Sequence, residues 1–270
     1  MPKTKINNID IYYEVHGAGE PLLLIMGLGA NATAWVLQIE EFSKHYTVIS
    51  FDNRDSGRSE KMAASYSMRQ MASDAIGLLD ELSIGTAHVF GMSMGGMIAQ
   101  ELVLHYPDRV RSLVLGGTMA GGPQAVMAGP QLITEWISIA GLPLEQKIEA
   151  GLRFLYSDGF IAENKERLLE RSLTNSHLMA PPNALQRQIM AVMGYNVHDR
   201  LREIDAPTLV LTGTDDKIVP SANSKILVNG IPAADLVEFE YAGHGFIIEK
   251  AQETNAHVLD FLQPHKIPAN

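Results

Sequence analysis

Short apolar runs alternate with amphipathic stretches over the first part of the chain, a pattern typical of β–α–β units. Apolar, β-branched runs predict strands at 6–15 (interrupted by Asn7-Asn8), 22–26, 47–51, 86–90 and 110–115. Helical spacing predicts helices at 34–46, 68–82 and 97–106. Continuously apolar strands joined by helices predict a mostly parallel, doubly wound α/β sheet covered on both faces, and Asn7-Asn8 predicts an antiparallel hairpin at its start.

The pattern changes after Gly116-Gly117. From residue 119 to 203 no strand is apparent, and helices are expected at 132–139, 144–156, 162–172 and 184–201. The sheet resumes with strands at 207–212 and 236–240 and helices at 222–228 and 251–262. We therefore predict a core domain made of residues 1–118 and 204–270, with a helical cap, residues 119–203, inserted between two strands.

Composition narrows the range of functions. The 270 residues are 46% hydrophobic and carry a formal net charge of −10, which argues against a nucleic-acid partner because phosphate binding needs clustered basic residues. The absence of cysteine excludes disulfides, thiolate metal sites and a cysteine nucleophile. The first residues lack the apolar run of a secretory signal and no segment is long enough to span a bilayer, so we expect a cytoplasmic protein with no membrane partner.

The segment Gly91-Met92-Ser93-Met94-Gly95-Gly96 stands between a predicted strand and a predicted helix. A Gly-x-Ser-x-Gly in that context is a nucleophile elbow, in which the serine occupies a strained position at the tip of a tight turn. Glycines two residues to either side allow the strand and the helix to pass without a side-chain clash. Ser93 is therefore the candidate nucleophile.

A serine hydroxyl is a weak nucleophile at neutral pH, so it needs a base, and the base needs an orienting acid. Of the nine histidines, His244 is the one in a short, Gly-flanked loop directly after a predicted strand. The loop after the strand at 207–212 contains Asp215 and Asp216, and either of them can serve as the acid. The chain order Ser, Asp, His matches one known arrangement of this triad.

The loop Gly27-Leu28-Gly29-Ala30-Asn31-Ala32, with Asp52 at the end of the next strand, imitates a dinucleotide-binding fingerprint. The elbow favours another role for these glycines, because a loop at this place can bring a backbone N–H beside the serine to form half of an oxyanion hole. No organic cofactor and no metal is therefore expected. The charges of Arg54, Asp55 and Arg58 are interpreted as a network that holds their own loop.

Three motifs together make the chain resemble the α/β-hydrolase superfamily over essentially its whole length. They are the Gly91–Gly96 elbow, the Gly213-x-x-Asp216-x-x-x-Pro220 loop and the Gly243-His244 loop. The resemblance implies the eight-stranded α/β-hydrolase sheet, and its motif places the triad acid on Asp216, with Asp215 second. Residues 52–59 and 93–100 are similar to a bacterial esterase subgroup that includes the aclacinomycin methylesterases.

The resemblance also assigns the oxyanion hole to the backbone N–H groups of Leu28 and Met94. The chain departs from many relatives in this loop, because it has Met26-Gly27 where they have His-Gly. Since the donors belong to the backbone, the hole should survive, but the missing histidine is expected to change how the loop is braced.

The expected activity is that of a serine hydrolase that cleaves a carboxylic ester of a small, largely apolar substrate through an acyl-enzyme. Enol-lactone hydrolysis, carbon–carbon bond hydrolysis and perhydrolysis with the same triad remain alternatives. A carbon–carbon substrate carrying a carboxylate lacks an evident basic cluster, although Arg153 or Arg187 of the cap can serve. A ligand-binding protein without turnover is the alternative outside catalysis.

A set of apolar residues in the cap and around the predicted loops provides the candidate substrate pocket. The residues assigned to it are Met26, Met127, Trp136, Tyr195 and Phe246, and the adaptable cap residues Phe154, Met179, Met190 and Met193 are further candidates. The competing interpretation is that most of these side chains simply pack the cap helices together.

Overall fold

A computed structural model describes residues 3–139 and 141–267. Its eight strands form one sheet in the order β1-β2-β4-β3-β5-β6-β7-β8. The strands are β1 (Lys3–Ile6), β2 (Ile9–His16), β3 (Glu20–Ile25), β4 (Tyr46–Phe51), β5 (Ala87–Met92), β6 (Val110–Gly116), β7 (Thr208–Gly213) and β8 (Ala234–Phe239). The predicted mostly parallel sheet is confirmed, since β4, β3 and β5 to β8 pair in parallel and only the pairs made by β2 are antiparallel.

The antiparallel hairpin at the start of the chain is also confirmed. Asn7 and Asn8 connect β1 to β2 with φ angles of 49° and 65°. Two consecutive residues with positive φ make the turn that matches the twist of the paired strands, and asparagine tolerates this conformation better than most residues.

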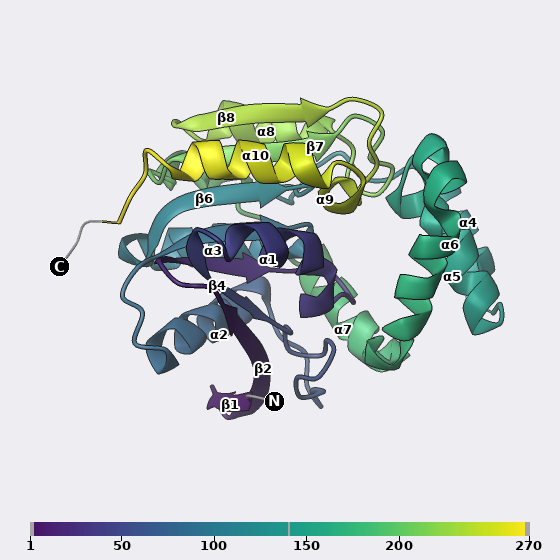
Figure 1. Cartoon of the computed structure of the whole chain (residues 1–270), viewed down its shortest axis with the longest axis horizontal. Helices are drawn as coiled ribbons and strands as arrows, with labels where there is room; N and C mark the ends of the chain where they lie inside the picture. The colour runs from purple at the N-terminus through teal and green to yellow at the C-terminus, as the bar shows by residue number, and fades with distance from the viewer. Residues whose placement is uncertain (1–2, 140, 268–270) are drawn as a thin grey trace.

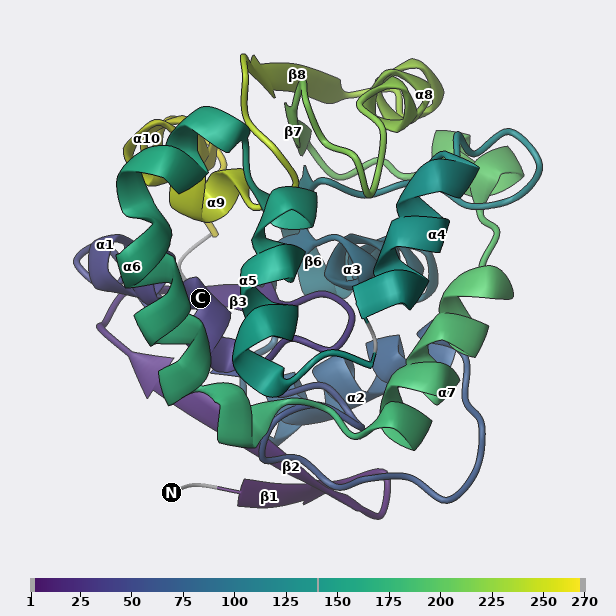
Figure 2. The ribbon, with the colours of Figure 1, turned by 90° about the vertical axis from the view of Figure 1, so that its right-hand side faces the viewer.

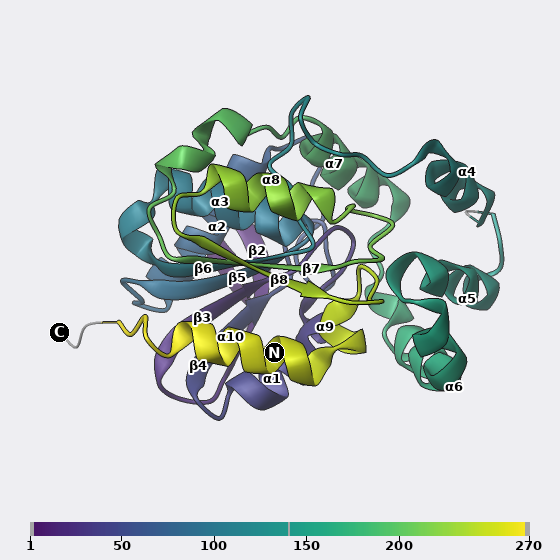
Figure 3. The same cartoon turned by 90° about the horizontal axis from the view of Figure 1, so that it is seen from above.

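Helices cover both faces of the sheet (Figure 3). Helices α1 (Val36–Phe42), α9 (Phe246–Glu249) and α10 (Ala251–Leu262) lie on one face, and α2 (Met68–Glu81), α3 (Met94–His105) and α8 (Ala222–Gly230) lie on the other. Each layer buries its own apolar cluster against the sheet. The carboxyl ends of the parallel strands all lie at one edge of the sheet, and this is the edge at which open α/β sheets bind their ligands.

The chain between β6 and β7 is helical, as the sequence pattern predicts. It contains α4 (Pro130–Ile139), α5 (Leu144–Leu155), α6 (Asp158–Thr174) and α7 (Pro182–Met193). These four helices lie beyond the carboxyl ends of the strands (Figures 1 and 2). Among the described residues of this segment, strand pairing is limited to an isolated bridge between Gly121 and Asn196.

Two predicted helices are shorter than expected. The one expected at 34–46 is a 3-10 turn (Ala32–Trp35) followed by α1, and Tyr46 already belongs to β4. The one expected at 184–201 ends with α7 before Gly194, and a separate 3-10 turn (His198–Glu203) follows. Across the described ranges, the longest apolar helical stretch still falls short of what is needed to cross a membrane.

Candidate active site

Ser93 lies at the tip of a tight turn between β5 and α3. Its φ of 58° and ψ of −123° fall in a region that non-glycine residues rarely adopt, which costs about 1–3 kcal/mol elsewhere in proteins. Two hydrogen bonds hold the turn in place: the Ser93 N–H donates to Gly116 O at 2.7 Å, and Thr118 Oγ1 donates to Ser93 O at 2.7 Å. The strained backbone leaves the side chain partly exposed at the carboxyl end of β5.

The glycines of the elbow are required by close approach of the backbone. A Cβ on Gly91 would lie 2.3 Å from Gly95 O, and a Cβ on Gly95 would lie 2.0 Å from Ile25 O at the end of β3. Both distances are far below any real Cβ contact. The first residues of α3 are therefore pressed between β5 and the end of β3.

His244 and Asp216 are brought together from two different strand ends. His244 Nδ1 lies 2.6 Å from Asp216 Oδ2, and both side chains are buried. The other carboxylate oxygen, Oδ1, accepts the N–H groups of Ile218 (2.9 Å) and Val219 (2.8 Å), so the carboxylate is held on both sides. Asp215 is exposed, and its backbone N–H donates to Ala242 O.

The imidazole of His244 lies beside the serine turn. Gly116 accepts the Ser93 N–H, and a Cβ on the next residue, Gly117, would lie 3.3 Å from Nδ1 and Cε1 of the imidazole. In the described part of the chain Ser93 Oγ makes no hydrogen bond, either to this imidazole or to another group. Such contacts are often long before substrate binds and shorten in the complex.

Two backbone N–H groups beside Ser93 have no hydrogen-bond partner among the described residues. They belong to Leu28, in the loop after β3, and to Met94, the first residue of α3. The loop runs close to the serine, because a Cβ on Gly27 would lie 2.8 Å from Ser93 Cβ. The two predicted oxyanion donors thus belong to the segments on either side of the serine.

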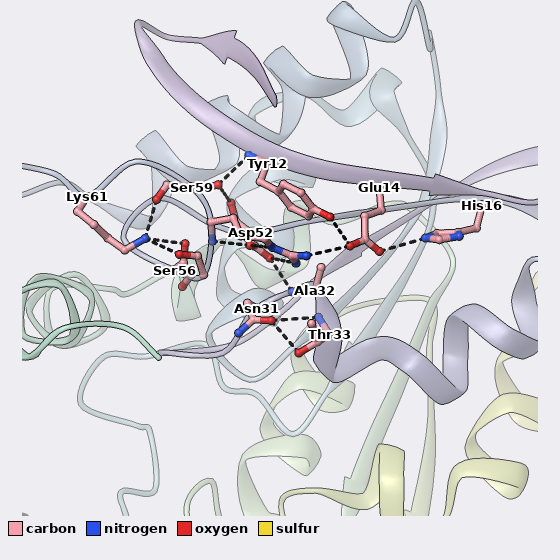
Figure 4. A network of polar contacts seen from close by, with 12 residues as sticks. Tyr12, Glu14, His16, Asn31, Ala32, Thr33, Asp52, Ser56, Ser59 and Lys61 are labelled. Atoms are coloured by element: carbon pink, nitrogen blue, oxygen red, sulfur yellow. Dashed lines mark hydrogen bonds and ion pairs between the residues drawn. The ribbon is translucent and has the colours of Figure 1, made fainter. Parts of the chain in front are cut away.

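The loop after β3 is supported by an ionic network centred on Asp52 (Figure 4). Asp52 Oδ1 accepts the Ala32 N–H at 2.8 Å, and Oδ2 accepts Arg58 Nε at 2.8 Å. Arg58 lies 3.5 Å from the Tyr12 ring centroid and also donates to Glu14. Burial and the hydrogen bond to Glu14 raise the pKa of Tyr12 to about 12. Asp52 has no exposed surface and is fully engaged here, so it is not available to hold a nucleotide ribose.

The charges that follow β4 form the expected loop network. Arg54 Nε and Nη2 donate to the two oxygens of Asp74 at 2.6 and 2.7 Å in a buried pair. Asp55 accepts two hydrogen bonds from Arg187 of α7, both 2.8 Å, and one from the Tyr66 hydroxyl. Burial by itself would raise the pKa of Asp55. The hydrogen bonds from Arg187, a backbone N–H and Tyr66 lower it by more, so the pKa of this carboxyl lies below the ordinary 3.8.

The loop that carries the histidine is attached to the helical segment between β6 and β7. Gly243 N–H donates to Glu249 Oε2 at 3.0 Å, and Gly245 N–H donates to Leu155 O at 2.6 Å. The carboxylate of Glu249 also accepts the hydroxyl and the N–H of Ser157 at the start of α6. The position of the imidazole therefore depends on contacts with this segment.

The structure separates the predicted pocket residues into two groups. Tyr195 and Phe246 are buried in the apolar core, where Phe246 is stacked on Phe239, so their side chains have little surface open to a ligand in this structure, and their place in a pocket stays a prediction. Met26 is also buried, directly before the loop after β3. Met127 and Trp136 are exposed on the helical segment, at 55% and 46%. Apolar composition alone does not tell a core side chain from a surface one.

The methionines of α7 that are predicted to line the pocket have exposed side chains. Met190 and Met193 are 61% and 67% exposed, and Met179 before this helix is 50% exposed. Phe154 is buried and its ring lies 6.1 Å from that of Trp136. Across the described ranges, no three His, Asp or Glu side chains are grouped in a way that could hold a metal ion.

Two residues that contact the catalytic loops are missed by the sequence analysis. Gln188 on α7 hydrogen-bonds the loop after β3, and Glu249 on α9 hydrogen-bonds the histidine loop. Neither belongs to a recognisable motif. Gln188 bonds Gly29, 159 residues away, and Glu249 bonds Gly243 and Ser157, 6 and 92 residues away. The burial of Gln188 cannot be read from the sequence, so no local signal marks it.

A strained serine after the central parallel strand β5, beside a hydrogen-bonded His–Asp pair from the ends of β7 and β8, defines a hydrolase built on an α/β sheet. A family model of the alpha/beta hydrolase fold matches residues 20–251. The chain therefore belongs to the α/β-hydrolase family, and the predicted resemblance is confirmed.

Proteins of known name and known structure agree with this assignment. The chain is 34% identical over 263 residues to a protein of Azorhizobium caulinodans named "Putative carbamate hydrolase RutD", covering 97% of this chain and 98% of that one. The enol-lactonase from Burkholderia xenovorans LB400 has a TM-score of 0.84 and 25% identity, covering 97% of this chain and all of that one. The N-acyl homoserine lactone degrading enzyme Est816 has a TM-score of 0.81 and 29% identity, covering 96% and 100%.

Proposed function

We propose that this hydrolase cleaves a carboxylic ester of a small, uncharged substrate through a serine acyl-enzyme. The observation that carries the proposal is the strained, partly exposed Ser93 beside a His244–Asp216 pair whose polar atoms are 2.6 Å apart. A serine becomes a useful nucleophile when a histidine of fixed tautomer can take its proton, and the carboxylate on Nδ1 leaves Nε2 for that role.

In the first half of the reaction, Ser93 Oγ attacks the ester carbonyl while His244 Nε2 takes the hydroxyl proton. Asp216 holds the imidazole in the required tautomer and stabilises the imidazolium. The N–H groups of Leu28 and Met94 donate to the carbonyl oxygen as it becomes negative, and one such donor contributes about 3–4 kcal/mol in a well-studied case. The imidazolium then protonates the leaving alcohol, and the acyl group stays on the serine.

In the second half, water takes the place of the alcohol. His244 Nε2 removes a proton from the water, whose oxygen attacks the acyl carbon, and the same two N–H groups receive the second oxyanion. The imidazolium returns the proton to Ser93 Oγ as the carbon–oxygen bond to the serine breaks. The products are a carboxylic acid and the free enzyme.

Charge pairing supports an uncharged substrate. Of the two cap arginines that can serve a substrate carboxylate, Arg187 donates two hydrogen bonds to buried Asp55. Arg153 is about half exposed, lies 3.5 Å from Glu135 and packs over the Phe154 ring. A carboxylate-bearing substrate of carbon–carbon bond hydrolysis would have to compete with these partners. The proposal therefore ranks esters and lactones above that chemistry.

A carbamate is the second candidate substrate, and the name of the Azorhizobium caulinodans relative favours it. Carbamate esters present the same carbonyl to the serine, but the adjacent nitrogen donates electron density and makes that carbonyl less electrophilic. Their hydrolysis therefore needs the same triad and relies more strongly on the oxyanion hole.

We also propose that residues 119–203 act as a cap that shapes the acyl pocket. The four helices lie beyond the strand ends, and exposed Trp136 of α4 and Met190 of α7, with exposed Met127 in the segment before α4, support this role. Such flexible and aromatic side chains suit a pocket with modest demands on acyl shape.

The test is a series of p-nitrophenyl substrates that share one leaving group: esters from acetate to dodecanoate, and the N-methyl and N,N-dimethyl carbamates. We expect ester turnover that disappears in Ser93→Ala and persists in Ser138→Ala, a matched change at an exposed serine of α4. After treatment with an alkyl fluorophosphonate, mass spectrometry should find the alkylphosphonyl group, which has lost fluoride, on Ser93 only. Turnover that survives Ser93→Ala would refute the serine mechanism, and faster carbamate than ester turnover would select the second candidate.

A further inference from the structure

One glutamine of α7 joins the two loops that follow β3 and β4. The Gln188 side chain is completely buried, and all of its polar atoms are used. Oε1 accepts the Gly29 N–H at 2.8 Å, while Nε2 donates to Arg54 O at 3.0 Å and to Ser56 Oγ at 2.9 Å. Three hydrogen bonds from one buried amide hold both loops in a single relative position, since breaking any of them leaves a buried polar group unsatisfied.

These hydrogen bonds act directly beside the proposed oxyanion donor. Leu28, whose N–H has no partner in the described part of the chain, is followed by Gly29, which Gln188 holds, and preceded by the Met26–Gly27 pair. The Met26 carbonyl accepts a hydrogen bond from Asn53 Nδ2 at 2.8 Å. The loop is thus braced by two side-chain amides, those of Gln188 and Asn53.

The neighbouring residues of α7 show that the helix is firmly placed against this loop. Arg187 donates both arms of its guanidinium to Asp55, which has no exposed surface. Leu185 Cδ1 lies 3.2 Å from where a Cβ of Gly29 would be, and Gly29 has a φ of +69° that L side chains rarely adopt. The absence of a side chain at Gly29 therefore lets the backbone of the loop lie close to α7.

We infer that Gln188 is a positioning residue that couples the docking of α7 to the geometry of the oxyanion hole. The inference rests on the proposed function, because it concerns the direction of the Leu28 N–H during acyl transfer. The three hydrogen bonds of Gln188 go to Gly29, Arg54 and Ser56 and not to Ser93, so Gln188 acts on the oxyanion hole through Gly29. Its loss should weaken stabilisation of the transition state more than substrate binding.

The test compares Gln188→Leu with two controls. Leucine has a similar volume but cannot form any of the three hydrogen bonds, so the Gly29 N–H loses its acceptor. Gln186→Leu makes the same change at an exposed position of the same helix. Val258→Ala removes buried apolar atoms of α10 and reports what a general loss of stability does to the rates. Steady-state kinetics on the best p-nitrophenyl ester, the rate of Ser93 phosphonylation by an alkyl fluorophosphonate, and Tm are measured for all four proteins.

We expect Gln188→Leu to lower kcat by about 10²-fold, as a displacement of about 1 Å at a reacting centre does, and to change KM less than threefold. Phosphonylation should slow in parallel, because the phosphoryl oxygen occupies the same hole while Ser93 Oγ displaces fluoride. Gln186→Leu should match the wild type, and Val258→Ala should lower Tm with unchanged kcat.

Two results overturn the inference. If Gln188→Leu is folded and keeps the wild-type kcat and phosphonylation rate, Gln188 does not position the hole. If Val258→Ala loses kcat as Gln188→Leu does at an equal loss of Tm, the effect is general loosening. The failure of the proposed function looks different: the wild type itself would then neither turn over esters nor be phosphonylated at Ser93, and the inference would fall with it.

Discussion

The tightest backbone contact of the elbow leads to a quantitative prediction for Gly95→Ala. The added Cβ would lie 2.0 Å from Ile25 O and 3.0 Å from Met26 O, and real Cβ atoms do not approach closer than about 3.0 Å. The gap between α3 and the end of β3 must therefore open by at least about 1 Å. Because the opposing atom belongs to the backbone of a central strand, no side-chain rotation can relieve the contact.

This displacement separates the two proposed oxyanion donors. Met94 moves with the start of α3, whereas Leu28 stays with the loop that continues β3. A shift of about 1 Å costs on the order of 10²-fold in rate, and complete loss of one donor costs about 10²–10³-fold. Overpacking of this kind costs about 1–3 kcal/mol of stability. We expect a folded enzyme with kcat lowered by roughly 10²–10³-fold.

The assay combines kcat and KM for the best p-nitrophenyl ester with thermal unfolding. The matched control is Gly151→Ala in α5, where the added Cβ meets no heavy atom within 4 Å. Because alanine is the better helix former, this control should gain about 0.5–1 kcal/mol of stability and keep its kcat. A folded Gly95→Ala variant with wild-type kcat would refute the idea that packing of α3 on β3 sets the geometry of the hole.

Three further predictions concern buried carboxylates. Asp216→Asn should lower kcat by about 10⁴-fold, as the equivalent change does in a serine protease triad. Asp215→Asn, at the exposed neighbour, should leave kcat unchanged. Equal effects of the two changes in steady-state kinetics would contradict the assignment of Asp216 as the acid that orients His244. Arg54→Met leaves Asp74 buried and unpaired, so urea unfolding at pH 7 should show a loss of about 3–5 kcal/mol, and a loss below 1 kcal/mol would argue against a desolvated pair. Folding lowers the pKa of the Asp55 carboxyl, so the stability that this carboxylate contributes is complete above its unfolded pKa of 3.8 and is lost as the pH falls through the lower folded pKa. The unfolding free energy of Asp55→Asn should therefore approach that of the wild type below pH 4. A difference between the two proteins that stays constant across that pH range would contradict this linkage.

Local patterns were enough to predict most of the sheet and the positions of the chemical groups along it. Continuous apolar runs predict the parallel strands, because a strand buried on both faces needs apolar side chains at every position. Asn7-Asn8 predicts its hairpin, since the turn requires positive φ at two consecutive residues. The elbow and the His244 loop follow from the same logic, as each one is a short Gly-flanked turn at the end of a strand.

Other features depend on which segments meet in space. The residues alone leave Asp215 and Asp216 equivalent, and only the position of the β7–β8 strand ends brings Asp216 to His244. Tyr195 and Phe246 are as apolar as Met127 and Trp136, yet the first two lie in the core and the last two are exposed.

The sequence by itself determined the strand and helix pattern, the elbow, and the candidate nucleophile and base, because these depend on residues within about ten positions of one another. The tertiary structure alone showed that Asp216, the carboxylate that the family motif favours, is hydrogen-bonded to His244. It also decided which apolar side chains stay exposed, and it brought Gln188 to Gly29, 159 residues away in the chain, where it braces the loop that contains Leu28. The physical reason is that hydrogen bonds and burial depend on distance in space, and periodicity along the chain reports only the neighbours of a single element.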